Sequence, residues 1–255
     1  MRFDVLTLFP ELFPPFLSHG VTRRAFDSGQ ISVHVHLIRD FADGGYRRVD
    51  DRPFGGGPGM VMMAEPLARC LDAVRQQRGD QAPVVLFSPA GRRLDQAAVQ
   101  RWSAGQGAIL VCGRYEGVDQ RFIEACVSEQ ISLGDFVLSG GEIAAMALMD
   151  SVARLQGGVL NSPASHQQDS FGSELDGLLD CPHYTRPPDW RGRAVPEVLL
   201  SGDHARISAW RRETSLAHTA QLRPDLITRA RQAGSLKPAD EAVLGSLPLS
   251  GSTRA

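Results

Sequence analysis

Two short runs of apolar residues constrain the fold of this chain most strongly. Residues 83–87 and 108–111 are apolar throughout, which is typical of central strands that are buried on both faces. Between them, residues 94–102 carry apolar side chains at helical spacing. Because strands alternate with helices here, the sequence predicts an α/β fold with a largely parallel sheet.

Further strands extend this pattern. Residues 3–8 predict a strand, and residues 31–37 alternate apolar and polar side chains, as in a strand with one solvated face. His34 and His36 fall on that polar face. We interpret them as solvated strand positions rather than as metal ligands.

Three more helices are predicted from apolar side chains spaced by three and four residues. The first begins near Pro66, and the second covers residues 118–126. The third, over residues 142–155, has the clearest pattern, with Ile143, Met146, Ala147, Asp150 and Arg154 at this spacing.

The periodic pattern breaks near Gly157, which predicts a change of domain. Residues 1–160 then form the α/β domain, residues 161–173 a flexible polar linker, and residues 174–255 a small, mainly helical domain. In the second domain, Asp203 is expected to cap a helix that contains Ile207, Trp210 and Leu216. The tail, residues 249–255, is expected to fray.

Composition excludes several classes of protein. No apolar run approaches the roughly 20 residues that span a bilayer, and the N-terminus lacks the shape of a signal peptide. The four cysteines are scattered without a CxxC pair, so we expect reduced thiols in a cytoplasmic protein, no membrane contact and no structural metal. Lys237 is the only lysine and lies far from any glycine loop, which argues against P-loop and Schiff-base chemistry.

Arginine dominates the basic residues, although the formal net charge is −2. The arginines cluster, and two interpretations stay open: a solvated, salt-bridged surface, or contacts with phosphates and bases. The clusters are Arg47, Arg48 and Arg52; Arg186, Arg191 and Arg193; and Arg206, Arg211 and Arg212.

Two glycine-containing loops follow strand patterns, at residues 112–119 and 133–142. Glycine lets the backbone approach a flat ligand closely, because no Cβ intervenes. Loops at adjacent strand ends predict one ligand pocket at the carboxyl edge of the sheet. Neither loop matches GxGxxG or a P-loop, so a dinucleotide or triphosphate site is not indicated.

These loops, together with residues 88–91, resemble those of the bacterial tRNA (guanine-N1)-methyltransferase family, the TrmD family of the SPOUT class. The resemblance runs in register from Met1 to about Arg229 and includes three more signatures, at residues 50–60, 179–187 and 198–204. It implies a SPOUT-type parallel sheet with a deep trefoil knot at about residues 87–144, followed by a small helical domain that binds tRNA. Ala90, Ala144 and Asp203 depart from the family's usual Gln, Pro and Asn.

The resemblance implies S-adenosylmethionine-dependent methylation of guanine N1 at position 37 of tRNA, next to the anticodon. Glu116 or Asp135 could favour the positive sulfonium. The implied cofactor residues are Leu86, Phe87, Ser88, Pro89, Gly113, Tyr115, Gly117, Leu133, Gly134, Asp135, Phe136, Val137, Leu138, Gly140 and Gly141.

Three catalytic residues are implied by the same resemblance. Asp169 takes the guanine N1 proton, Arg154 contacts guanine O6 and stabilises its developing charge, and Glu116 either steadies its loop or faces the guanine. Without the resemblance, Asp169 would be an ordinary linker residue, and Arg154 would form an i,i+4 ion pair with Asp150.

The remaining implications concern partners. His183, Tyr184 and Arg186 contact RNA, or else belong to a proline-rich structural turn. Mg²⁺ is expected to be required for activity near Glu116 and Asp169, without an all-protein metal cage. A homodimer is implied, in which the linker and second domain of one subunit complete the pocket of the other. A SPOUT methyltransferase with another RNA target and a non-catalytic RNA-binding module remain the alternatives.

Overall fold

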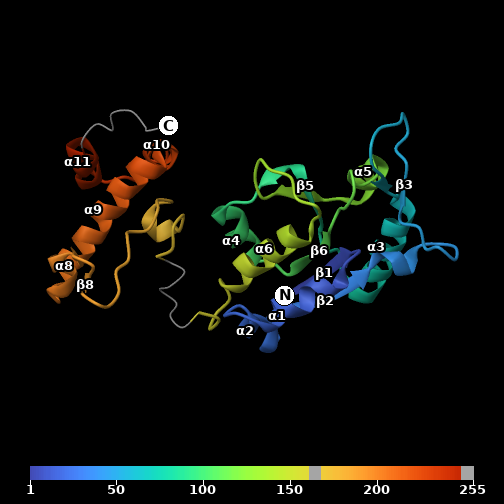
Figure 1. The fold of residues 1–255 in the computed structure, drawn as a ribbon, viewed down its shortest axis with the longest axis horizontal. Coiled ribbons are helices and arrows are strands. Elements are labelled where there is room, and N and C mark those ends of the chain that lie inside the picture. The colour runs from blue at the N-terminus through green and yellow to red at the C-terminus, as the bar shows by residue number, and fades with distance from the viewer. Residues whose placement is uncertain (161–167, 248–255) are drawn as a thin grey trace. The chain divides into compact units, whose positions relative to one another are not determined.

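The computed structural model describes residues 1–160 and 168–247. The predicted tail at 249–255 and the first part of the predicted linker lie outside these residues. The chain divides into two compact units, residues 1–161 and 162–255, and each is considered by itself. Figure 1 shows the α/β unit and the helical unit.

A five-stranded sheet forms the first unit, in the order β2-β1-β6-β5-β7. All neighbouring strands are parallel, which confirms the predicted α/β class. Four of the strands were predicted, whereas β7 was not. The strands are β1 (Arg2–Thr7), β2 (Ser32–Leu37), β5 (Val84–Arg93), β6 (Gly107–Val111) and β7 (Glu129–Ser132). A separate antiparallel ribbon pairs β3 (Asp50–Asp51) with β4 (Val61–Met62).

Helices cover both faces of the sheet, because successive strand residues point to opposite sides. Val85 and Leu110 pack in a core with helices α1, α2, α4 and α6, whereas Leu86 and Ile109 pack in another with α3 and α5. The helices are α1 (Phe13–Ser18), α2 (Arg23–Asp27), α3 (Ala64–Arg78), α4 (Gln96–Ser103), α5 (Gln120–Cys126) and α6 (Glu142–Ala153), with 3-10 turns η1 (Pro10–Leu12) and η2 (Ile38–Phe41).

The predicted helix over residues 142–155 is confirmed as α6, but its buried face differs from the spacing that predicted it. Ile143 is 57% exposed. The buried face consists of Glu142, Ala144, Ala145, Leu148, Met149, Val152 and Ala153.

The prediction that His36 is a solvated strand residue is wrong. Its Nε2 lies 2.9 Å from Oδ1 of Asp4, which is fully buried on β1. Arg2 and Arg78 also donate to this carboxylate. Burial alone would raise the pKa of Asp4, but hydrogen bonds from these three partners hold it well below its usual value. His34, by contrast, is exposed as predicted.

The second unit is built around α9 (His204–Leu222), with α10 (Pro224–Gln232) and α11 (Pro238–Ser246) packed against it. Its core contains Leu178, Leu216, Ile227 and Ala230. The predicted cap is confirmed: Oδ1 of Asp203 accepts from the backbone N–H groups of Ala205 and Arg206, both at 3.1 Å. Smaller elements are η3 (Ser173–Leu175), β8 (Asp189–Trp190), β9 (Arg193–Ala194) and α8 (Glu197–Leu200).

Within residues 1–160 and 168–247, no helix combines the length and the apolar character needed to cross a membrane.

Candidate functional site

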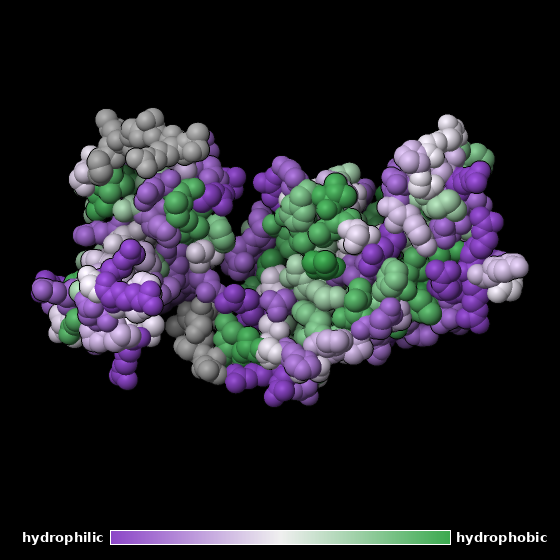
Figure 2. Space-filling view, viewed as in Figure 1, coloured by the Kyte–Doolittle hydropathy of each residue, from purple (hydrophilic) through white to green (hydrophobic). Residues whose placement is uncertain are grey.

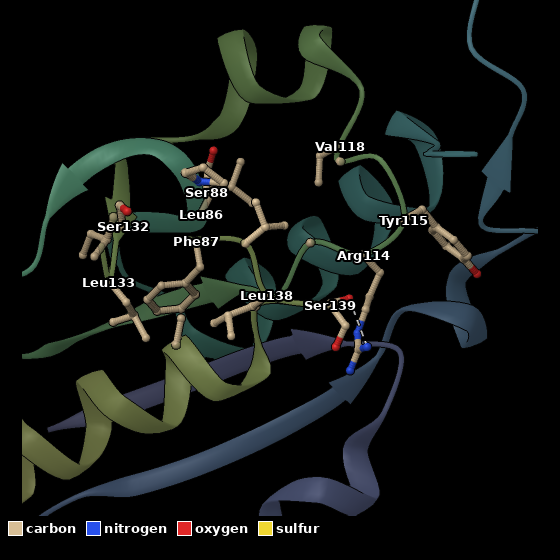
Figure 3. A pocket seen from close by; sticks show the side chains of 18 of the residues that line it. Leu86, Phe87, Ser88, Arg114, Tyr115, Val118, Ser132, Leu133, Leu138 and Ser139 are labelled. Carbon is tan, nitrogen blue, oxygen red and sulfur yellow. Dashed lines mark hydrogen bonds between the residues drawn. The ribbon is translucent and has the colours of Figure 1, made fainter. Parts of the chain in front are cut away.

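A cavity of about 430 Å³ lies beside the middle of β5 and at the carboxyl ends of β6 and β7. Its walls come from the middle of β5 and from the segments around the ends of β6 and β7, and Figure 3 shows their side chains converging. The prediction that the two glycine loops meet at one sheet edge is therefore confirmed, but the strands they follow are not adjacent as predicted, because β5 lies between β6 and β7. Every sequence-predicted cofactor residue except Asp135 lines this cavity: Leu86, Phe87, Ser88, Pro89, Gly113, Tyr115, Gly117, Leu133, Gly134, Phe136, Val137, Leu138, Gly140 and Gly141.

A register break in β5 shapes the first wall. Phe87 and Arg92 both pair with Ile131 of β7, so the residues between them leave the strand ladder. Ser88 and Pro89 of this bulge line the cavity. The bulge thus interrupts the β5–β7 ladder beside the cavity, and pairing resumes at Arg92.

The second wall, residues 112–119, is held by the end of the β3–β4 ribbon. The backbone N–H of Glu116 donates to the carbonyl of Met60 at 2.9 Å, and that of Met62 donates to Gly117 at 2.9 Å. A Cβ at Gly59 would collide with the Glu116 side chain. Glycine at position 59 therefore makes room for the Glu116 carboxylate, which is exposed and lines the cavity.

The third wall meets the second through a backbone contact at the start of α6. The N–H of Gly141 donates to the carbonyl of Gly113 at 3.0 Å. A Cβ at Gly141 would lie 2.8 Å from the Cα of Cys112, closer than real Cβ contacts allow. The sequence predicted that these glycines approach a ligand; at Gly141 the structure shows instead a close approach of the two loop backbones to each other.

An ion pair that the sequence analysis missed also joins these two walls. Arg114 Nε lies 3.0 Å from Oε2 of Glu142, whose side chain is only 1% exposed. The other carboxylate oxygen accepts from Thr7 Oγ1 at 2.8 Å, and Arg114 Nη1 donates to the Ser139 carbonyl at 3.1 Å (Figure 3). The guanidinium also stacks 4.3 Å from the ring centroid of Phe9. A glutamate at the first position of an apolar helix was the available signal.

Asp135 lies apart from the cavity lining. Its carboxylate is 89% exposed and accepts from Arg93 at 2.7 Å. Of the two carboxylates considered for the sulfonium, Glu116 alone lines the cavity.

Arg154 does not lie at the cavity either. It follows the last residue of α6, whereas Ala144 in the first turn lines the cavity. Ten residues of helix separate these positions by about 15 Å. Arg154 instead lines a shallow hollow with His19, Thr22 and Asp150, where Thr22 Oγ1 donates to Asp150 at 3.0 Å.

Asp169 belongs to the second unit, in a hydrogen-bonded loop. Its carbonyl accepts from the N–H of Gly172 at 3.0 Å. His183, Tyr184 and Arg186 are exposed in the same unit, and the Tyr184 ring lies 6.2 Å from that of Trp210. Aromatic and arginine side chains at a surface suit contact with unstacked bases and phosphates.

Within the described residues, one group of three metal-competent side chains was found: Asp180, Cys181 and His183 in the second unit. His183 Nε2 lies 2.8 Å from Asp180, so a hydrogen bond accounts for this pair. Glu116 is not in this group.

The arginines near β3 form exposed ion pairs. Arg47 pairs with Asp40 at 2.8 Å and Arg48 with Asp51 at 3.0 Å. Figure 2 shows mainly hydrophilic and neutral residues around this part of the first unit. These pairs agree with the salt-bridged surface interpretation for the two arginines, and the alternative of contacts with phosphates stays open.

The fold and the cavity define an α/β protein whose parallel sheet carries a cavity of small-molecule size at its carboxyl edge. Comparison with known proteins identifies its family. The model of the family "tRNA (Guanine-1)-methyltransferase TrmD" matches residues 1–229. The chain is 71% identical, over 246 residues, to the tRNA (guanine-N(1)-)-methyltransferase of Albidiferax ferrireducens, covering 96% of this chain and 99% of that protein. It is 67% identical to the enzyme of the same name from Paracidovorax citrulli, covering 97% and 98%. The chain belongs to the TrmD family of tRNA (guanine-1)-methyltransferases.

Proposed function

We propose that this protein methylates guanine N1 at position 37 of tRNA, with S-adenosylmethionine as the methyl donor. The observation that carries the proposal is the cavity: three segments that bear the family's signatures come together at one sheet edge. The chain's similarity to named tRNA (guanine-N(1)-)-methyltransferases over nearly its whole length supports the same reaction.

The cavity suits S-adenosylmethionine by size and by chemistry. Its volume of about 430 Å³ lies in the range of small-molecule sites. Leu86, Phe87, Leu133 and Leu138 supply apolar walls for the adenine (Figure 3). The glycine loops supply backbone hydrogen-bonding groups, and Glu116 supplies a negative charge near the sulfonium.

When bound, S-adenosylmethionine supplies an electrophilic methyl group on sulfur. The chain's own residues then prepare the acceptor. Guanine N1 carries a proton, which the Asp169 carboxylate takes as the N1–methyl bond forms and the carbon–sulfur bond breaks with its electron pair on sulfur. Arg154 donates to guanine O6 and stabilises the negative charge that develops there. His183, Tyr184 and Arg186 hold the RNA.

We further propose the family's finer architecture for this chain. The sheet carries a deep trefoil knot at about residues 87–144, and residues 174–255 form a tRNA-binding domain. Mg²⁺ is required for transfer, bound weakly with several waters near Glu116 and Asp169.

The position of Arg154 supports a homodimer with a shared site. About 15 Å of helix separates it from the cavity wall of its own chain, farther than an arginine side chain reaches. An isologous dimer, in which each chain contributes the same surface, can bring Arg154 of one subunit to the cavity of the other. This arrangement differs from the one in which Arg154 serves the cavity of its own chain and only Asp169 crosses.

Methyl transfer to purified tRNA tests the function directly. Transfer is expected to guanine at position 37 and to be lost when adenine replaces it. Modification at another base would favour a SPOUT enzyme with a different target. Tight cofactor binding with zero turnover would favour a non-catalytic RNA-binding module.

Two variants test the catalytic roles. Asp169→Asn keeps the shape but loses the base, so single-turnover transfer should fall by about 10²- to 10⁴-fold with cofactor affinity retained. Arg154→Ala should also abolish transfer, and Arg154→Lys should restore little, because lysine lacks the planar fork. An ordinary surface ion pair predicts full activity and a stability loss below about 1 kcal/mol.

Mixing inactive variants tests which subunit supplies each group. Gly113→Leu, which places a side chain between Leu86 and Val118 at the cavity, serves as the cofactor-deficient partner. Mixed with Asp169→Asn, it should recover roughly a quarter of wild-type activity, since half of randomly exchanged dimers carry one intact site. No recovery in proven heterodimers would refute a shared site.

Arg154→Ala then separates the two arrangements. If Arg154 crosses to the partner's cavity, its mixture with Gly113→Leu recovers activity, and its mixture with Asp169→Asn does not. If Arg154 serves its own chain's cavity, the mixture with Asp169→Asn recovers activity and the mixture with Gly113→Leu does not.

A further inference from the structure

The loop that carries Asp169 is built onto the body of the second unit. The backbone N–H of Phe171 donates to the carbonyl of Leu178 at 2.8 Å, and that of Gly177 donates to Gly172 at 3.1 Å. These bonds close the loop on itself. From residue 168 onward, the structure therefore shows a folded segment where the sequence suggested a loose linker.

The return strand of this loop is anchored on α9 by buried groups. Leu178 is fully buried in the core of the unit. The N–H of Leu179 donates to Thr219 Oγ1 at 3.1 Å, and Ser215 Oγ donates to the Leu179 carbonyl. Both hydroxyls are almost fully buried, so each backbone group of Leu179 has a partner and cannot be released cheaply.

A second tie fixes the turn of the loop. Asp176 adopts a left-handed backbone conformation with φ of 55°. Its carboxylate accepts from Arg212 Nη2 of α9 at 2.8 Å, and Arg212 also pairs with Asp240 of α11. The turn is thus tied to α9 through Arg212, and Asp240 of α11 holds the guanidinium of Arg212.

Asp180 connects this anchor to both functional segments. Its backbone N–H donates to Ser170 Oγ at 2.9 Å, next to Asp169. Its side-chain Oδ2 lies 2.8 Å from Nε2 of the exposed His183. A single residue therefore touches the neighbour of the proposed base and a residue proposed to hold RNA.

We propose that Ser170 and Asp180 are positioning residues that hold the Asp169 carboxylate in a fixed relation to bound tRNA. This inference rests on the proposed function. The segment that grips the RNA and the segment that carries the base move as one piece, so tRNA bound at His183 and Tyr184 places the base on the guanine. Loss of the Ser170 acceptor should lower the rate of transfer without weakening tRNA binding.

Substitutions at Ser170 test this role in the full-length protein. Ser170→Thr keeps the hydroxyl acceptor. Ser170→Val has nearly the shape of the threonine variant but lacks the hydroxyl. At saturating tRNA and S-adenosylmethionine, Ser170→Val should lose roughly 10-fold or more in single-turnover rate, the scale of a small misplacement of a reacting group. Ser170→Thr should stay within about twofold of wild type, since it retains the hydrogen bond. The dissociation constant for tRNA should be unchanged in both.

Ser173→Ala is the matched control, because this exposed serine of the same loop has no such bond to Asp180. A wild-type rate in Ser170→Val overturns the proposal, as does equal loss in Ser170→Thr or a loss confined to tRNA affinity. Asp169→Asn, measured alongside, distinguishes failure of the proposed base from failure of the proposed positioning role. If that variant transfers normally, the base assignment itself fails; if it is inactive while Ser170→Val is normal, only the positioning role fails.

Discussion

Removing Arg114 from its ion pair with Glu142 should destabilise the protein more than removing the charge of Glu142. Arg114→Met leaves the Glu142 carboxylate, 1% exposed, with Thr7 as its remaining close donor. Removing one partner of a buried pair costs about 3–5 kcal/mol. Because Arg114 is 19% exposed and its charge is partly solvated, we expect about 2–4 kcal/mol in the free energy of unfolding.

Glu142→Gln should cost less, about 1–2 kcal/mol. The amide oxygen can still accept from Thr7, and Arg114 keeps its bond to the Ser139 carbonyl and its access to solvent. The double variant Arg114→Met/Glu142→Leu leaves no unpaired charge. It should be less destabilised than the sum of the single variants, with a coupling of about 1–3 kcal/mol.

Urea unfolding of the first unit measures these differences. Trp102 is its only tryptophan, since Trp190 and Trp210 belong to the second unit. Replacing those two with Phe leaves a fluorescence signal from the first unit alone. Arg48→Met, which breaks an exposed ion pair with Asp51, is the control and should cost less than about 1 kcal/mol.

The same variants should weaken S-adenosylmethionine binding, because Arg114 and Glu142 join two walls of the cavity. Calorimetric titration measures the affinity. A cost below about 1 kcal/mol for Arg114→Met, or strict additivity in the double variant, would refute the view that a buried charge is being neutralised here.

Two further outcomes follow from buried groups in the first unit. The pKa of Asp4 is lowered in the folded state, so its ion pairs stabilise the protein at pH values above the ordinary Asp pKa of about 4. This contribution to stability is lost as the pH falls below about 4. Thermal melts from pH 7 to 2 should therefore show that Asp4→Asn is less stable than wild type at neutral pH, and that its stability depends less on acid. Gly141→Ala should lower both the melting temperature and the cofactor affinity, because its Cβ would lie 2.8 Å from the Cys112 backbone. Gly113→Ala is the control. A Cβ at Gly113 would meet side chains only at ordinary contact distances, so this variant should melt like wild type.

The sheet could be predicted where burial is continuous along the chain. Residues 83–87 and 108–111 have apolar side chains on both faces, so each strand was visible without knowledge of its neighbours. β7 was missed because three of its four residues, Glu129, Gln130 and Ser132, are polar. His36 was misread because its partner, Asp4, lies 32 residues earlier in the chain, and no local period reveals such a pair.

The same distinction separates the predicted parts of the site from the missed ones. The glycine loops carry their signal in consecutive residues, so their meeting at one edge followed from the parallel sheet. The contact of Arg114 with Glu142 depends on how the two loops face each other. The separation of Arg154 from the cavity appears only once the length and direction of α6 are known.

These contacts imply that the cavity walls and the loop that carries Asp169 are each stabilised by their own set of contacts. The walls of the cavity are held by one another, through Gly141 and Gly113, and by the β3–β4 ribbon. The base loop is held by α9, through Leu179 and Asp176. Substitutions in the cavity walls should therefore alter cofactor affinity, and substitutions in the base loop should alter the rate of methyl transfer. Their effects should be independent when the substitutions are combined. The methyl-transfer step itself is then where the two assemblies must be coupled.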